Sequence, residues 1–137
     1  MRQRVLDTNI LINHWGYRRT RARRTIAQLT VDVAVQWGHE LESIRGSNLI
    51  LTPICIEYLC GRRSPHEMDL AKAFLSAFHV ADEGRIFDED WEQALRIASR
   101  IPRDGAYRQL GDCLIRAISR RLRLDVDTDD ARFPVDA

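Results

Sequence analysis

Short apolar segments alternate with longer amphipathic segments along this chain of 137 residues. We expect four strands, at residues 4–7, 49–51, 79–81 and 124–128. Between them, apolar residues recur every three or four positions, which is the spacing of a helix that buries one face. Strands that alternate with helices form an α/β fold with a mainly parallel sheet. The sequence therefore predicts an α/β protein, and its length fits a single domain, residues 1–137.

Local signals predict where the helices begin and end. Thr8 follows the first strand and begins a helix, and Thr52-Pro53 begins another after the second strand. Further helices are expected over residues 20–46, 64–77, 88–101 and, after Gly111, to Leu122. The apolar stripe of the 20–46 segment is more often core than interface, although a dimer surface there is also plausible. It consists of Ile26, Leu29, Val33, Trp37, Leu41 and Ile44.

The distribution of charge is more informative than its total. The chain has 21 Lys and Arg against 20 Asp and Glu, and this balance by itself predicts no nucleic-acid partner. Five arginines nevertheless form one block without an acid between Asp7 and Asp32: Arg18, Arg19, Arg21, Arg23 and Arg24. Guanidinium groups bind phosphates through paired hydrogen bonds, so the block is a candidate surface for binding RNA or DNA. A solvated helix face, or a face that pairs with acids of a partner protein, remains the alternative.

The cysteines and the hydropathy indicate a cytoplasmic protein. Cys55, Cys60 and Cys113 are odd in number and lack the CxxC spacing. We therefore expect reduced, mostly buried thiols and no zinc site. No apolar run approaches the roughly 20 residues of a membrane helix. The apolar stretch after Arg4 is broken by Asp7, so no signal peptide is expected either.

Four acids stand in apolar surroundings. They are Asp7, Glu57, Asp112 and one of the acids in residues 125–130. An ionised carboxylate next to a core loses solvation and needs a compensating partner. Asp7 and the acids after Val126 follow strands, and parallel sheets bind ligands beyond the carboxyl ends of their strands. Carboxylates gathered there would repel one another, so the sequence predicts that a hard divalent cation binds them.

Four blocks of the sequence resemble PIN-domain nucleases. Val5-Leu-Asp-Thr-Asn-Ile-Leu-Ile12 resembles the family's opening strand, and Glu57-Tyr-Leu-Cys-Gly61 resembles its Glu-Leu-x-x-Gly block. Gly111-Asp-Cys-Leu-Ile-Arg-Ala117 and Thr128-Asp-Asp-Ala-Arg-Phe133 resemble its last two blocks, and all four keep the family's order. The small size is similar to that of VapC-like toxins of toxin–antitoxin pairs. The resemblance implies a three-layer α/β/α fold and a Mg²⁺- or Mn²⁺-dependent endoribonuclease, usually dimeric and inhibited by an antitoxin.

The resemblance also implies roles for particular residues. Asp7, Asp112 and Asp130 are expected to bind the metal directly, and Glu57 directly or through water. The Thr-x-Asp spacing selects Asp130, with Asp129 as the alternative. Asn9 and Thr128 are expected to orient the carboxylates or the scissile phosphate. A site made only of carboxylates suits Mg²⁺ or Mn²⁺ better than zinc.

Three other functions compete with this interpretation. Asp125, Asp127 and Asp129 imitate the first ligands of a calcium loop, but Asp130 stands where the turn needs Gly. An Asp-x-Asp phosphatase would carry its motif after the first apolar strand, not near residue 125. A non-catalytic RNA-binding or protein-interaction module on the same fold would keep the arginine block without a working metal site. Such a module has no physical need for four clustered acids.

Overall fold

A computed structural model describes residues 2–101, 110–130 and 133. Its described strands form a four-stranded sheet in the order β3-β2-β1-β4, and every pairing is parallel. The strands are β1 (Arg4–Leu6), β2 (Leu49–Ile50), β3 (His79–Val80) and β4 (Asp125–Asp127). The predicted α/β fold with a parallel sheet is thus confirmed.

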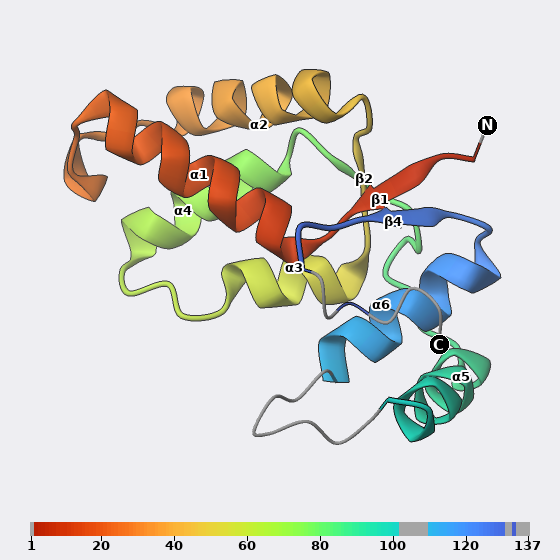
Figure 1. Ribbon diagram of the computed structural model, residues 1–137. Helices are drawn as coiled ribbons and strands as arrows, with labels where there is room; N and C mark the ends of the chain where they lie inside the picture. Colours follow the sequence, from red (N-terminus) through yellow and green to blue (C-terminus); the bar gives the residue numbers. More distant parts are fainter. Residues whose placement is uncertain (1, 102–109, 131–132, 134–137) are drawn as a thin grey trace.

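Helices cover the sheet and complete a three-layer α/β/α arrangement (Figure 1). In the described parts these are α1 (Thr8–Ala22), α2 (Val31–Arg45), α3 (Thr52–Leu59), α4 (Pro65–Leu75), α5 (Asp88–Ser99) and α6 (Leu110–Arg121), with a short 3₁₀ helix, η1 (Ile26–Gln28). Helix α2 packs against α4, whereas α5 packs against α6. None of the described helices has the length and apolar character that crossing a membrane requires.

The predicted helix boundaries hold where capping residues mark them. The Ser64 hydroxyl accepts a hydrogen bond from the Glu67 amide at 3.1 Å and begins α4. Gly46 ends α2 in the left-handed conformation, with a φ of 70°. Both residues were recognisable in the sequence because their conformational roles are local.

The prediction of one helix over residues 20–46 is wrong. Helix α1 continues to Ala22 and ends at Arg23, which adopts a left-handed φ of 53°. Thr25 then begins η1, and its amide donates to the Gln28 side chain at 2.9 Å. The Thr30 hydroxyl accepts from the Val33 amide at 3.3 Å and begins α2. Polar side chains thus start new helical segments although the apolar spacing runs across the break.

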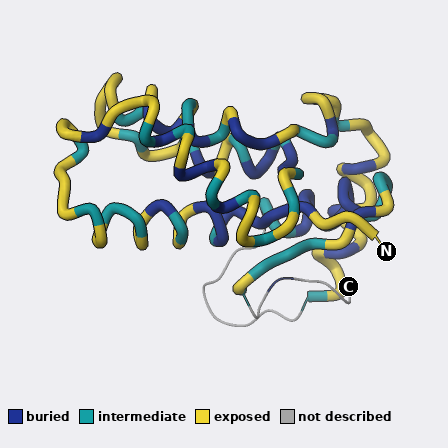
Figure 2. The backbone as a smooth tube through the Cα atoms, turned by 90° about the horizontal axis from the view of Figure 1, so that it is seen from above, coloured by how far each residue is buried: buried dark blue, intermediate teal, exposed yellow. Residues whose placement is uncertain are grey.

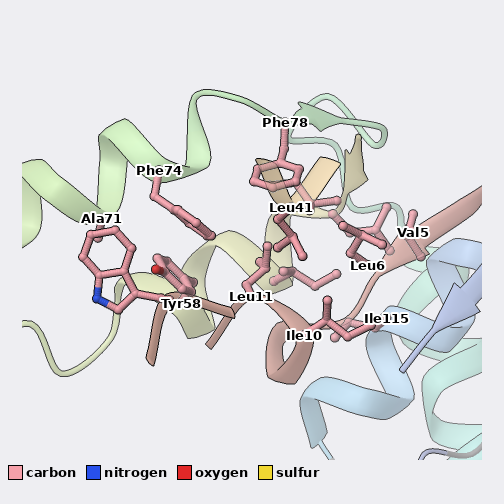
Figure 3. Packing of buried hydrophobic residues seen from close by; sticks show 14 of the residues in the cluster. Val5, Leu6, Ile10, Leu11, Leu41, Tyr58, Ala71, Phe74, Phe78 and Ile115 are labelled. Atoms are coloured by element: carbon pink, nitrogen blue, oxygen red, sulfur yellow. The ribbon is translucent and has the colours of Figure 1, made fainter. Parts of the chain in front are cut away.

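The apolar stripe of that segment mainly belongs to the core. Leu29, Trp37 and Leu41 are buried, whereas Ile44 is 65% exposed. Figure 2 shows buried and exposed residues alternating along the helices, as expected of amphipathic helices around a core. Figure 3 shows this core built from β1, α1, α2, α3, α4 and α6, with Leu6, Leu41, Tyr58, Phe74 and Ile115 among its members.

The thiols are less buried than the sequence suggested. All three cysteines are free, but only Cys113 is buried. Cys60 is exposed because it follows the last turn of the short helix α3, and Cys55 is partly covered. The expectation of mostly buried thiols is therefore wrong.

Candidate metal centre

Asp7 lies at the junction of β1 and α1, at the carboxyl edge of the sheet. Its amide continues the ladder by donating to the Asp127 carbonyl at 2.9 Å. Its side chain, in a residue only 4% exposed, caps α1 by accepting from the Thr8 amide at 2.8 Å. The second carboxylate oxygen accepts from the Thr128 hydroxyl at 2.7 Å. The strand end, the helix start and the segment after β4 together fix this carboxylate.

Thr8 joins Asp7 to the second predicted acid, Glu57. The Thr8 hydroxyl donates to Glu57 Oε1 at 2.8 Å, while its amide holds Asp7. Glu57 lies on α3 and is exposed over part of its surface. Its other oxygen lies so close to Gly111 that a Cβ there would be only 2.6 Å away. Glu57 therefore extends from α3 to both α1 and the start of α6.

Asp112 follows Gly111 in the first turn of α6 and is half-buried. An acid in a first helical turn is stabilised by the unpaired amides and the helix dipole. Since Glu57 packs on the neighbouring Gly111, Asp112 belongs to the same edge of the sheet as Asp7 and Glu57. The sequence predicted that Asp112 lies at this edge, because Asp112 stands near the N-terminus of an amphipathic helix.

Thr128 connects the acids after β4 with the rest of the site. Its hydroxyl donates to Asp7, accepts from the Asp130 amide at 3.0 Å, and lies 3.4 Å from Asn9 Nδ2. Asn9 also accepts from the Asp129 amide at 3.4 Å. Asn9 and Thr128, both predicted to support the carboxylates, thus lie between β1 and the acidic segment. Asp129 points elsewhere, toward Arg45 at the end of α2.

The electrostatics of the site disfavour negative charge. Burial raises the pKa of Asp7, and hydrogen bonds from Thr128 and Thr8 lower it in part. The charges of Asp130 and, to a lesser degree, Asp129 raise it again. Burial likewise raises the pKa of Glu57, the hydrogen bond from Thr8 lowers it, and the charge of Asp7 raises it. A bound cation would relieve both effects.

The donor chemistry fits a hard divalent cation. Asp7 and Glu57 offer carboxylate oxygens, which Mg²⁺ and Mn²⁺ prefer, and both lie where negative charge is costly. Within the described residues, no three Asp, Glu, His or Cys side chains are close enough together to hold one ion. The acids are instead linked in pairs: Asp7 with Glu57 through Thr8, and Asp7 with Asp130 through their charges.

The predicted arginine block lies at the end of α1 farthest from Asp7 (Figure 1). The 15 residues of α1 rise about 22 Å, so Arg23 is far from the acids. Arg18 turns toward α2, where its Nε lies 3.2 Å from Glu40 and its guanidinium 5.3 Å from the Trp37 ring centroid. Arg19 is half-buried, while Arg21, Arg23 and Arg24 are exposed. The block thus divides into a part held by α2 and an exposed tip.

Three residues of the site were missed in the sequence. Thr8 could have been identified from the sequence, because a hydroxyl next to a buried acid at a helix start is a common capping arrangement. Gly111 offered only a weak signal, a glycine just before an acid. Arg45 offered none, since its contacts with Asp127 and Asp129 join positions more than 80 residues apart.

Comparison with known proteins agrees with this geometry. The family model of the PIN domain matches residues 4–135, nearly the whole chain. No curated protein and no solved structure shows significant similarity. PIN domains are generally metal-dependent nucleases, which is the chemistry that the carboxylates favour. On the strength of this match, which runs from the first strand to beyond Asp130, the chain belongs to the PIN-domain family.

Proposed function

We propose that this PIN domain is a Mg²⁺- or Mn²⁺-dependent endoribonuclease and the toxin of a toxin–antitoxin pair. The observation that carries the catalytic part is the pair Asp7 and Glu57, held by the two donors of Thr8 at the carboxyl edge of the sheet. Both carboxylates have a raised pKa and so gain from a nearby cation.

In this proposal Asp7 and Glu57 bind the ion first, and Asp112 and Asp130 complete the set of ligands as the ion draws together acids that the described structure links only in pairs. When bound, such an ion supplies a water activated near neutral pH and offsets charge on the leaving oxygen. The chain's own groups do the rest. Thr8 and Thr128 fix the two oxygens of Asp7, and Asn9 braces the segment that carries Thr128. This preorganisation keeps the acids in place before a phosphodiester arrives.

The preference for RNA and the toxin role are supported by the resemblance of the four sequence blocks to PIN-domain nucleases, together with a small size similar to that of VapC-like toxins. The same resemblance supports a cytoplasmic homodimer and an antitoxin that inhibits it. Exposed Ile44 on α2 is compatible with a dimer surface. The exposed tip of Arg21, Arg23 and Arg24 is about 22 Å of helix away from Asp7. It therefore suits either a long RNA or an acidic segment of the antitoxin.

The test compares cleavage of RNA and DNA oligonucleotides of one sequence, with Mg²⁺, Mn²⁺ or a chelator. We expect RNA cleavage that the chelator abolishes, and a loss of at least 100-fold, on the order of one essential catalytic group, in Asp7→Asn and Glu57→Gln. Asp69→Asn, an exposed acid on α4, is the matched control and should cleave normally. Cleavage that survives Asp7→Asn would refute the catalytic proposal, and equal cleavage of DNA would refute the preference for RNA.

The alternative is a binding module without catalysis, favoured by the position of the arginine tip away from the acids. Thermal shift with Mn²⁺ separates the two. A nuclease is stabilised by Mn²⁺, and the stabilisation disappears in Asp7→Asn, because binding to the folded state raises the melting temperature. A binding module shows no shift in either protein.

A further inference from the structure

Arg45, in the last turn of α2, contacts Asp127, the last residue of β4, and Asp129, two residues farther along the chain. Its Nη1 lies 3.5 Å from Asp127 Oδ1, and its Nη2 lies 3.2 Å from Asp129 Oδ2. Arg4 supports this arrangement, since it donates to the Arg45 carbonyl and its Nη1 lies 3.6 Å from Asp127 Oδ2. Two arginines from distant parts of the chain thus hold one short acidic segment.

These contacts divide the side chains of residues 127–130 into two groups that point in different directions. Successive side chains of an extended strand point to opposite sides. Asp127 and Asp129 are held by Arg45, whereas the Thr128 hydroxyl donates to Asp7 and accepts from the Asp130 amide.

We propose that Arg45 is a positioning residue that keeps Asp129 outside the metal centre and holds Thr128 and Asp130 at Asp7. The link to the metal rests on the proposed function, whereas the positioning itself does not. The fork of a guanidinium can engage two carboxylates at once, which an ammonium group cannot do with the same geometry. Since the Arg45 and Asp129 side chains are 31% and 45% exposed, their pairing contributes little to global stability. Its effect is therefore expected to be local.

Amide hydrogen exchange on the metal-free protein tests the positioning directly. In Arg45→Gln we expect exchange at the Asp129 and Asp130 amides to become at least several-fold faster, because their acceptors Asn9 and Thr128 lose their alignment. The Asp7 amide, which bonds within the sheet, should be unaffected. Arg2→Gln is the control, since Arg2 pairs with Asp125 at the start of β4. Unchanged exchange at both amides in Arg45→Gln would overturn the proposal.

Calorimetric titration with Mn²⁺ tests the consequence for the metal centre. Removing a positive charge beside an acidic site should tighten cation binding if charge alone matters. Positioning predicts the opposite, roughly tenfold weaker binding, as for other groups that orient metal ligands. Arg45→Lys, which keeps the charge but not the fork, should fall between wild type and Arg45→Gln. Binding as tight as wild type, or tighter, in Arg45→Gln would refute the positioning role.

The same titration separates Asp129 from Asp130. Asp130→Asn should abolish Mn²⁺ binding, whereas Asp129→Asn should weaken it only as much as Arg45→Gln. An equal loss of Mn²⁺ affinity in both acid variants would show that Asp129 is also a ligand. It would overturn the proposal that Arg45 keeps Asp129 outside the metal centre. If wild type bound no Mn²⁺, the proposed function would fail, and the exchange experiment would still decide whether Arg45 positions the segment.

Discussion

Replacing Gly111 by Ala should impair the metal centre without unfolding the protein. A Cβ at this position would lie 2.6 Å from Glu57 Oε2 and 3.0 Å from Glu57 Cδ, whereas ordinary contacts begin at 3.4 Å. Glu57 is attached through a flexible side chain, so we expect its carboxylate to move, not the backbone of α6. The movement is at least about 0.8 Å and takes the carboxylate off α6, straining its hydrogen bond with Thr8.

Two opposing effects keep the change in stability small. Alanine in place of glycine stabilises a helix by up to about 1 kcal/mol. Losing the Thr8–Glu57 hydrogen bond costs about 1.5 kcal/mol, the lower end for a charged acceptor, since the exposed part of Glu57 can bind water instead. The net change in the free energy of unfolding is then below about 1 kcal/mol, a shift of a few degrees in melting temperature. A displacement near 1 Å in a catalytic site, by contrast, can cost roughly 100-fold in rate.

The assay therefore measures RNA cleavage and thermal unfolding on the same preparation. Gly16→Ala is the matched control, because Gly16 lies inside α1 and a Cβ there meets no atom within 4 Å. It should gain up to about 1 kcal/mol of stability and cleave RNA like wild type. The reasoning fails if Gly111→Ala cleaves at the wild-type rate, or if its activity falls only in proportion to its unfolded fraction.

Two further predictions concern buried acids. The raised pKa of Asp7 means that the stability linked to its neutral form is complete at low pH and is lost as pH rises through that pKa. Asp7→Asn should therefore raise the melting temperature of the metal-free protein at neutral pH but not in acid, and a gain that does not depend on pH would contradict this sign. Asp90 on α5 is 1% exposed and accepts from Arg121 Nε of α6 at 2.7 Å. Asp90→Ala should lower the free energy of unfolding by about 3 kcal/mol in denaturant titrations, because Arg121 loses its partner, and an unchanged midpoint would refute that.

The sheet and most helix boundaries were predictable because their determinants are local. Apolar runs marked the strands, and Ser64 and Gly46 marked a helix start and a helix end. The break between α1 and α2 was missed for the opposite reason. The apolar residues continue with helical spacing across residues 23–30, while the break depends on Arg23 in a left-handed conformation and on the caps at Thr25 and Thr30. The spacing of apolar residues shows which face of a helix is apolar, but it does not show where the chain ends one helix and begins another in a new direction.

The candidate acids could be named from the sequence, but their contacts could not. Asp7 could be placed at a strand end from sequence alone. The pairing of Asp129 with Arg45 could not, because it depends on where the end of α2 lies relative to β4. The arginine block shows the same limit. In the sequence these arginines form one cluster of positive charge. In the fold, Arg18 turns toward Glu40 and Trp37, whereas Arg21 and Arg24 are exposed to solvent.

Thr8 has a specific function that its position as a first helical residue does not reveal. A generic helix start needs only the side chain of Asp7 as its cap. Here the amide of Thr8 binds Asp7 while its hydroxyl binds Glu57, so one residue sets the separation of an acid at the end of β1 from an acid on α3. Each acid still has lone pairs for a further ligand, because a carboxylate offers about four acceptor positions. The two bonds to Thr8 therefore orient the carboxylates and leave them able to coordinate a metal ion.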